Sequence, residues 1–158
     1  MPKTTMGNTI ISVCVCAMTG WLTIQAHAAR DAETIAKHLI EDFFYKYGYP
    51  EVMKTDNGGE FRNGTMRAIQ HFLYIRSALT TPYNSQANGK VEKRNSRIYD
   101  ILSTFCSSNE DNQRRWDDFL PVVSWAYNTT VNNTTGFTPF RAMFGREAHS
   151  PMTHGWKT

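Results

Sequence analysis

The chain has 158 residues, the size of one ordinary domain, and its 41% hydrophobic residues are enough for a continuous core. Charged residues make up 20% and aromatic residues 13%, a balance that excludes a globally disordered chain. The 17 basic and 14 acidic residues leave a formal charge of +3, which is compatible with a nucleic-acid partner but does not require one. Three cysteines and five isolated histidines indicate neither a disulfide framework nor a zinc site, and the histidines are interpreted as surface or packing residues.

The first thirty residues admit two interpretations. Lys3, an apolar run over 10–22 and a small-residue site ending at Ala28 imitate a secretory signal. Two β-rich runs, 10–16 and 21–25, instead predict a β-hairpin, and we favour it because polar and turn residues interrupt the apolar run. No apolar run reaches the ~20 residues needed to cross a bilayer, so we expect no membrane protein.

The middle of the chain alternates between helix and strand. Asp31 can cap a helix with apolar residues at helical spacing until Gly48 and Pro50 end it. Residues 51–55 predict a short strand that ends before Asp56 and a Gly-rich turn. A short helix starting near 63 or 65, a strand around 74–79 and a polar loop over 80–84 follow.

The last part of the chain is predicted to be mainly helical. A helix from about Ala87 carries Glu92 in its first turns, and a second amphipathic helix must hold Pro121 in an early turn or bend there. Residues 128–158 are rich in turn formers. Helices between strands, with one hairpin, predict an α/β domain with a mixed sheet.

Asp56 and Glu92 are the chemical candidates, because one follows a strand and the other begins a helix, where two carboxylates could converge on a divalent metal ion. They have 35 residues between them. Spacing alone decides nothing, since 14 acidic residues in 158 give about one such pair by chance. Asp56 could simply end a turn and Glu92 could lie on a solvated face, so the surrounding motifs must carry the assignment.

Those motifs resemble the catalytic core of retroviral and retrotransposon integrases. The sequences TDNGGEF over 55–61 and TPYNSQANGKVEKRN over 81–95 are similar to its two signature blocks, in the same order and at the same separation. Stretches over 116–121, 126–128, 135–140 and 143–146 are similar to the end of gypsy-type long-terminal-repeat integrase cores. The resemblance covers about residues 1–150, which we take as the core-like domain, and leaves 151–158 as a tail.

The resemblance implies a ribonuclease H-like fold, flanked by helices, that binds Mg²⁺ or Mn²⁺ for 3′-processing and strand transfer of DNA. Asp56 would be the second acidic ligand and Glu92 the third, and hard oxygen ligands suit these ions. Residues on the loop and helix around Glu92 would contact nucleic acid: Tyr83, Asn84, Gln86, Asn88, Lys90, Lys93, Arg94 and Arg97. The implied partners are element ends, target DNA and further copies of the chain, with no membrane or small-molecule substrate.

One acidic ligand that the resemblance implies is missing from residues 1–30. The family places its first catalytic Asp on a strand before the hairpin, and residues 1–30 contain neither Asp nor Glu. We therefore expect a core that lacks its first strand, and we expect the isolated chain to be inactive. The resemblance places this strand at the centre of the sheet, so its loss would leave buried backbone donors of the neighbouring strands unpaired.

Three hypotheses follow. The favoured one is an incomplete integrase core of a retrotransposon, acting in the nucleus or elsewhere inside the cell. The second is a domesticated, non-catalytic module that binds nucleic acid or protein. The third is a secreted protein glycosylated at Asn63 and Asn128, which would require cleavage through the predicted hairpin.

Overall fold

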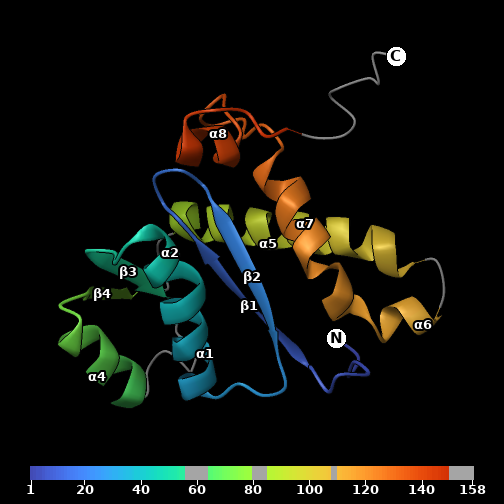
Figure 1. Ribbon diagram of the computed structural model, residues 1–158, viewed down its shortest axis with the longest axis horizontal. Helices are drawn as coiled ribbons and strands as arrows, with labels where there is room; N and C mark the ends of the chain where they lie inside the picture. The colour runs from blue at the N-terminus through green and yellow to red at the C-terminus, as the bar shows by residue number, and fades with distance from the viewer. Residues whose placement is uncertain (56–63, 80–84, 108–109, 150–158) are drawn as a thin grey trace.

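A computed structural model describes residues 1–55, 64–79, 85–107 and 110–149, with the backbone alone for 65–66, 79, 85–94 and 110. A β-hairpin lies at the centre, with one layer of helices on each of its faces (Figure 1). Alternate side chains of the hairpin enter two hydrophobic clusters, because successive residues of a strand point to opposite faces. The fold is therefore layered α/β, as the sequence predicts.

The hairpin consists of β1 (Ile10–Val15) and β2 (Leu22–His27). The strands pair antiparallel from Ile10 opposite His27 to Val15 opposite Leu22. Gly20 has φ of +74° in the connecting turn, a conformation that favours glycine. This confirms the hairpin prediction, and Leu22, with none of its surface exposed, is part of the core.

One long helical segment covers the first face of the hairpin. Asp31 caps α1 (Ala32–His38), its carboxylate accepting a 2.8 Å bond from the Thr34 N–H. The helix continues through a π-helical stretch, η1 (Leu39–Phe44), into α2 (Tyr45–Tyr47), and ends at Gly48 with φ of +93°. The predicted helix is confirmed, and its apolar stripe is buried against β1 and Trp21.

The remaining strands form a second sheet. β3 (Val52–Thr55) and β4 (Arg76–Leu79) pair in parallel and are connected through α4 (Gly64–Phe72). Strand directions are thus mixed, but the described strands form two separate two-stranded sheets rather than one. β1 has a second edge, which faces away from β2. Within the described residues, no strand pairs with that edge, so no strand links the hairpin to β3.

The second face of the hairpin packs against α5 (Ser85–Cys106) and α7 (Leu120–Asn128). The short α6 (Glu110–Gln113) and a 3₁₀ turn, η2 (Trp116–Phe119), connect them. Pro121 lies in the first turn of α7, where its missing N–H costs nothing, as predicted. The buried residues of this cluster are Leu22, Ile98, Leu102, Trp116, Leu120, Val123 and Tyr127.

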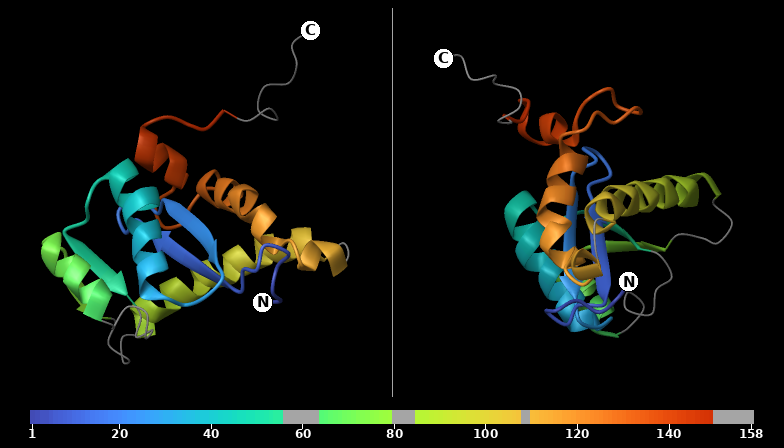
Figure 2. Two further views of the ribbon diagram at one scale, coloured as in Figure 1. Left: turned by 60° about the horizontal axis from the view of Figure 1, so that its bottom comes forward. Right: turned by 90° about the vertical axis from the view of Figure 1, so that its right-hand side faces the viewer.

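A further short helix, α8 (Pro139–Phe144), lies in the segment that is rich in turn formers, where no helix was predicted. It sits at the turn end of the hairpin (Figure 2) and packs the rings of Phe140 and Phe144 edge-on against Trp21, with centroids 6.0 and 5.1 Å away. Within the described ranges, no helix is both long and apolar enough to cross a membrane.

Candidate metal and nucleic-acid site

The predicted site residues fall into three groups. Asp56, Tyr83 and Asn84 lie outside the described residues. Arg97 is described with its side chain. The others lie on the helix α5, whose backbone alone is described there: Gln86, Asn88, Lys90, Glu92, Lys93 and Arg94.

The parallel sheet brings together the ends of the two strands that lead into the signature blocks. Thr55, the last residue of β3, pairs with Leu79, the last residue of β4. Asp56 follows the first of these strands, and the loop that leads into α5 follows the second. Because parallel strands end at the same edge of a sheet, the strands that precede the two signature blocks end side by side, and such edges are where α/β proteins place functional loops.

Both β3, which ends at this edge, and α5, which follows β4 along the chain, pack against the core. Thr55 is buried, and Met53 of β3 packs in the cluster under α1. On α5, Ile98 and Leu102 are 2% and 1% exposed, which fixes the helix two turns after Glu92. Both views show α5 beginning on the side of β3 and β4 and ending at α6 (Figures 1 and 2). The strand end and the helix start are therefore held by separate hydrophobic clusters.

Arg97 contacts protein within the described part of α5. It is half-buried, and its guanidinium carbon lies 5.6 Å above the centre of the Tyr127 ring of α7. It lines a cavity of about 360 Å³ together with Met18 of the hairpin turn and Asn132 of the loop before α8. A cation over an aromatic face is stabilised there, so this contact holds the Arg97 side chain against α7.

Among the described residues, no group of three or more His, Cys, Asp or Glu side chains could hold a metal ion. The nearest arrangement joins two histidines through a serine. The Ser12 hydroxyl lies 2.7 Å from His27 Nε2 and 2.9 Å from His38 Nδ1. Sequence reasoning interpreted the histidines as isolated, and it missed this cluster because strand and helix bring the rings together only in the fold.

The environment of the two histidines favours their neutral forms. Both are buried, with 4% and 6% of their surface exposed. Burial lowers the pKa of His27, with Asp31 acting in the opposite direction. Burial, and then the charge of His27, lower the pKa of His38 to about 4. The cluster is therefore an uncharged hydrogen-bonded contact between β1, β2 and α1 at neutral pH.

Solved structures identify the class of fold. The chain superposes on the catalytic core domain of HTLV-2 integrase in complex with magnesium, with a TM-score of 0.67, 18% identity and coverage of 84% of this chain and 83% of that one. It also superposes on a chain of the simian T-cell lymphotropic virus intasome, with a TM-score of 0.72, 23% identity and coverage of 92% and 50%. The fold is that of a retroviral integrase catalytic core, of the ribonuclease H-like type.

The sequence relatives are polyproteins of retroviruses and retrotransposons. The chain is 27% identical over 151 residues to the retrovirus-related Pol polyprotein from transposon 412 of Drosophila melanogaster, covering 96% of this chain and 12% of that protein. It is 30% identical over 152 residues to the Gag-Pol polyprotein of Feline leukemia virus, covering 96% and 9%. No protein-family model matches. The chain is thus a homologue of a small part of retroviral and retrotransposon Pol polyproteins, the part with the integrase core fold.

Proposed function

We propose that the chain is a retrotransposon integrase core-like protein that binds DNA and holds a divalent metal ion with Asp56 and Glu92. The observation that supports the proposal is the pairing of Thr55 with Leu79, because the two strands that lead into the signature blocks end at one sheet edge. Asp56 is the next residue after the first of these strands, and α5 with Glu92 follows the second. The homologues and the integrase core fold support the same reading.

Asp56 and Glu92 would hold Mg²⁺ or Mn²⁺, since carboxylate oxygens are the ligands that these hard ions prefer. A bound ion of this kind neutralises phosphate charge and activates an oxygen nucleophile in phosphodiester transfer. The resemblance implies three acidic ligands and matches two of them to residues of the given sequence, Asp56 and Glu92. We therefore propose weak metal binding and no strand transfer by the isolated chain.

The basic residues at the start of α5 would bind the phosphate backbone. Lys90, Lys93 and Arg94 occupy neighbouring positions along one helix, which is a common source of phosphate contacts. The partners would be element ends and target DNA, with assembly of several copies and a nuclear or other intracellular location. A domesticated, non-catalytic module that binds nucleic acid or protein is the second candidate.

Fluorescence anisotropy with a labelled DNA duplex tests the binding proposal. A triple variant, Lys90→Gln, Lys93→Gln and Arg94→Gln, is compared with a control that removes three exposed charges elsewhere, Lys3→Gln, Arg30→Gln and Lys37→Gln. The site variant should reduce the slope of log affinity against log salt by up to about 3, because each lost phosphate contact removes about 0.9. Equal slopes for the two variants would refute the proposed DNA surface.

A strand-transfer assay with Mn²⁺ separates the two candidate functions from an active enzyme. The unaltered chain should give no more product than Glu92→Gln. Product that depends on Glu92 would show that the isolated chain is catalytic and that the proposed inactivity is wrong.

A further inference from the structure

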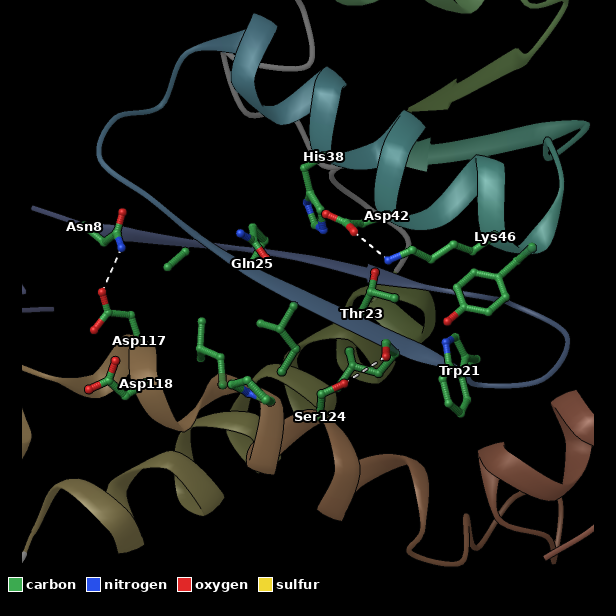
Figure 3. Close-up of a pocket in the computed structure, with 16 residues that line it drawn as sticks. Asn8, Trp21, Thr23, Gln25, His38, Asp42, Lys46, Asp117, Asp118 and Ser124 are labelled. Atoms are coloured by element: carbon green, nitrogen blue, oxygen red, sulfur yellow. Dashed lines mark hydrogen bonds and ion pairs between the residues drawn. The ribbon is translucent and has the colours of Figure 1, made fainter. Parts of the chain in front are cut away.

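Distant parts of the chain meet around the cavity beside Arg97. Its lining includes Met18 and Gly20 of the hairpin turn, Arg97 of α5, Tyr127 of α7 and Asn132 of the loop before α8. Its volume of about 360 Å³ lies within the range of about 300–1,000 Å³ that is common for ligand pockets. The cavity is therefore large enough for a small ligand or for one group of a larger ligand. The pocket of Figure 3 is a different one, which lies along β2.

Arg97 brings a positive charge to this cavity. Its contact with the face of the Tyr127 ring holds the side chain in place. Within the described chain the guanidinium forms no hydrogen bond and no ion pair, and its nitrogen atoms are accessible to solvent rather than buried. None of the described residues that line the cavity is Asp or Glu. The N–H donors of the guanidinium are thus available to an oxyanion, which Arg binds through two of them at once.

The loop before α8 adds neutral donors to the same cavity. The Thr134 N–H donates to Asn132 Oδ1 at 2.9 Å, which fixes the amide and leaves its Nδ2 group as the donor end. A Cβ atom added at Gly20 would lie 3.4 Å from this Nδ2, so the amide nitrogen lies beside the hairpin turn that lines the cavity. Among the described residues, neither Asn132 Nδ2 nor the Thr134 hydroxyl has an acceptor. Both groups are therefore available to a ligand.

This set of donors fits a phosphate group better than a carboxylate. A planar carboxylate is satisfied by two parallel N–H groups of one guanidinium. A phosphate carries oxygens in several directions, and it also accepts hydrogen bonds from amide and hydroxyl side chains. The cavity supplies a guanidinium from α5 and neutral donors from the loop before α8. Positive charge and donors from two segments together select a phosphate.

We propose that the cavity between the hairpin turn, α5 and the loop before α8 binds a phosphate group through Arg97, Asn132 and Thr134. The phosphate belongs either to a small phosphorylated compound or to a nucleic-acid backbone, and both present the same kind of oxygen atoms. The site uses neither Asp56 nor Glu92, and it uses none of the three basic residues proposed for DNA at the start of α5. Its failure and the failure of the proposed function are therefore separate results.

The test measures the binding of inorganic pyrophosphate to the full chain by isothermal titration calorimetry, in the absence of divalent metal ions. Arg97→Gln should weaken binding by at least about tenfold, because charge-assisted hydrogen bonds are lost. Arg114→Gln is the control, since it removes an exposed arginine that does not line the cavity, and it should leave the affinity unchanged. Equal affinities of these two variants, or no binding by the unaltered chain, would overturn the proposal.

A pair of variants at Met18 keeps the test independent of folding defects in Arg97→Gln, because the Met18 side chain is 84% exposed. Met18→Glu places a carboxylate in the lining of the cavity, where it repels the phosphate and competes for Arg97, so it should weaken binding severalfold. Met18→Gln has a similar size without the charge, and it should bind pyrophosphate as the unaltered chain does. Equal binding by the two Met18 variants would overturn the proposal too.

Competition identifies the source of the phosphate. A short DNA duplex that displaces pyrophosphate, and that binds Met18→Glu more weakly than Met18→Gln, would assign the cavity to a nucleic-acid backbone. A duplex that fails to displace pyrophosphate would assign it to a small phosphorylated compound. An acidic peptide of alternating Glu and Ala that displaces pyrophosphate at the same concentration as unlabelled pyrophosphate would show that the cavity takes carboxylates, and it would overturn the proposal.

Discussion

Asn128 clamps the first residue of β2 to α7, so its replacement by alanine should destabilise the whole fold. The side chain is 2% exposed, and it bonds both backbone groups of Leu22 at 2.9 Å. In Asn128→Ala the Leu22 N–H loses its acceptor, while the carbonyl keeps a 3.2 Å bond from the Ser124 hydroxyl. An orphaned buried N–H costs about 1–3 kcal/mol and the second lost bond about 0.5–1.5 kcal/mol, so unfolding should become easier by about 2–4 kcal/mol.

Thermal unfolding followed by circular dichroism measures this cost. For a domain of this size, about 2–4 kcal/mol corresponds to a fall in Tm of about 4–15 °C. Asn133→Ala is the control, because Asn133 is exposed and should change stability by less than about 0.5 kcal/mol. Equal Tm values for the two variants would refute the clamp.

Three further predictions concern the core, a helix end and pH. Leu102→Ala should cost about 2–5 kcal/mol in urea unfolding, because the side chain is 1% exposed, whereas Tyr99→Ala on the exposed side of α5 should cost much less. Gly48→Ala should cost about 1–3 kcal/mol, since φ of 93° and ψ of 161° lie in a region essentially restricted to glycine, and Gly64→Ala, at a position without positive φ and with open space, should not. The pKa of His38 is lowered to about 4 from 6.5, so the unfolded chain binds the proton more readily, and stability should be complete above pH 6.5 and fall as the pH drops toward 4. His38→Gln should flatten that pH profile; an unchanged profile would show that the cluster does not titrate as a buried group.

Local signals predicted most of the fold. Asp31 and Gly48 marked both ends of the first helical segment, because a cap and a positive-φ glycine act through neighbouring residues. Turn residues between two β-rich runs predicted the hairpin for the same reason. The signals of α8 were also present, with Thr138 as the cap, Pro139 in the first turn and Gly145 at the end, so this helix could have been predicted.

Contacts between distant residues could not be predicted in this way. The bond from Leu22 to Asn128 spans 106 positions, and no local pattern encodes it. The meeting of His27 and His38 depends on how α1 packs across the hairpin, and the separation into two sheets depends on which strands find partners. The predicted metal ligands are a different case: they come from two motifs, and the structure supports only the sheet edge and the helix on which those motifs lie.

Manganese binding tests the central claim most directly. Mn²⁺ is titrated into the chain and the free ion is measured by electron paramagnetic resonance, for the unaltered protein, Asp56→Asn, Glu92→Gln and the control Asp100→Asn, which removes an exposed carboxylate from the same helix. We expect one weak site that either Asp56→Asn or Glu92→Gln abolishes and that Asp100→Asn leaves unchanged. Binding that survives both site variants, or that Asp100→Asn removes equally, would contradict it.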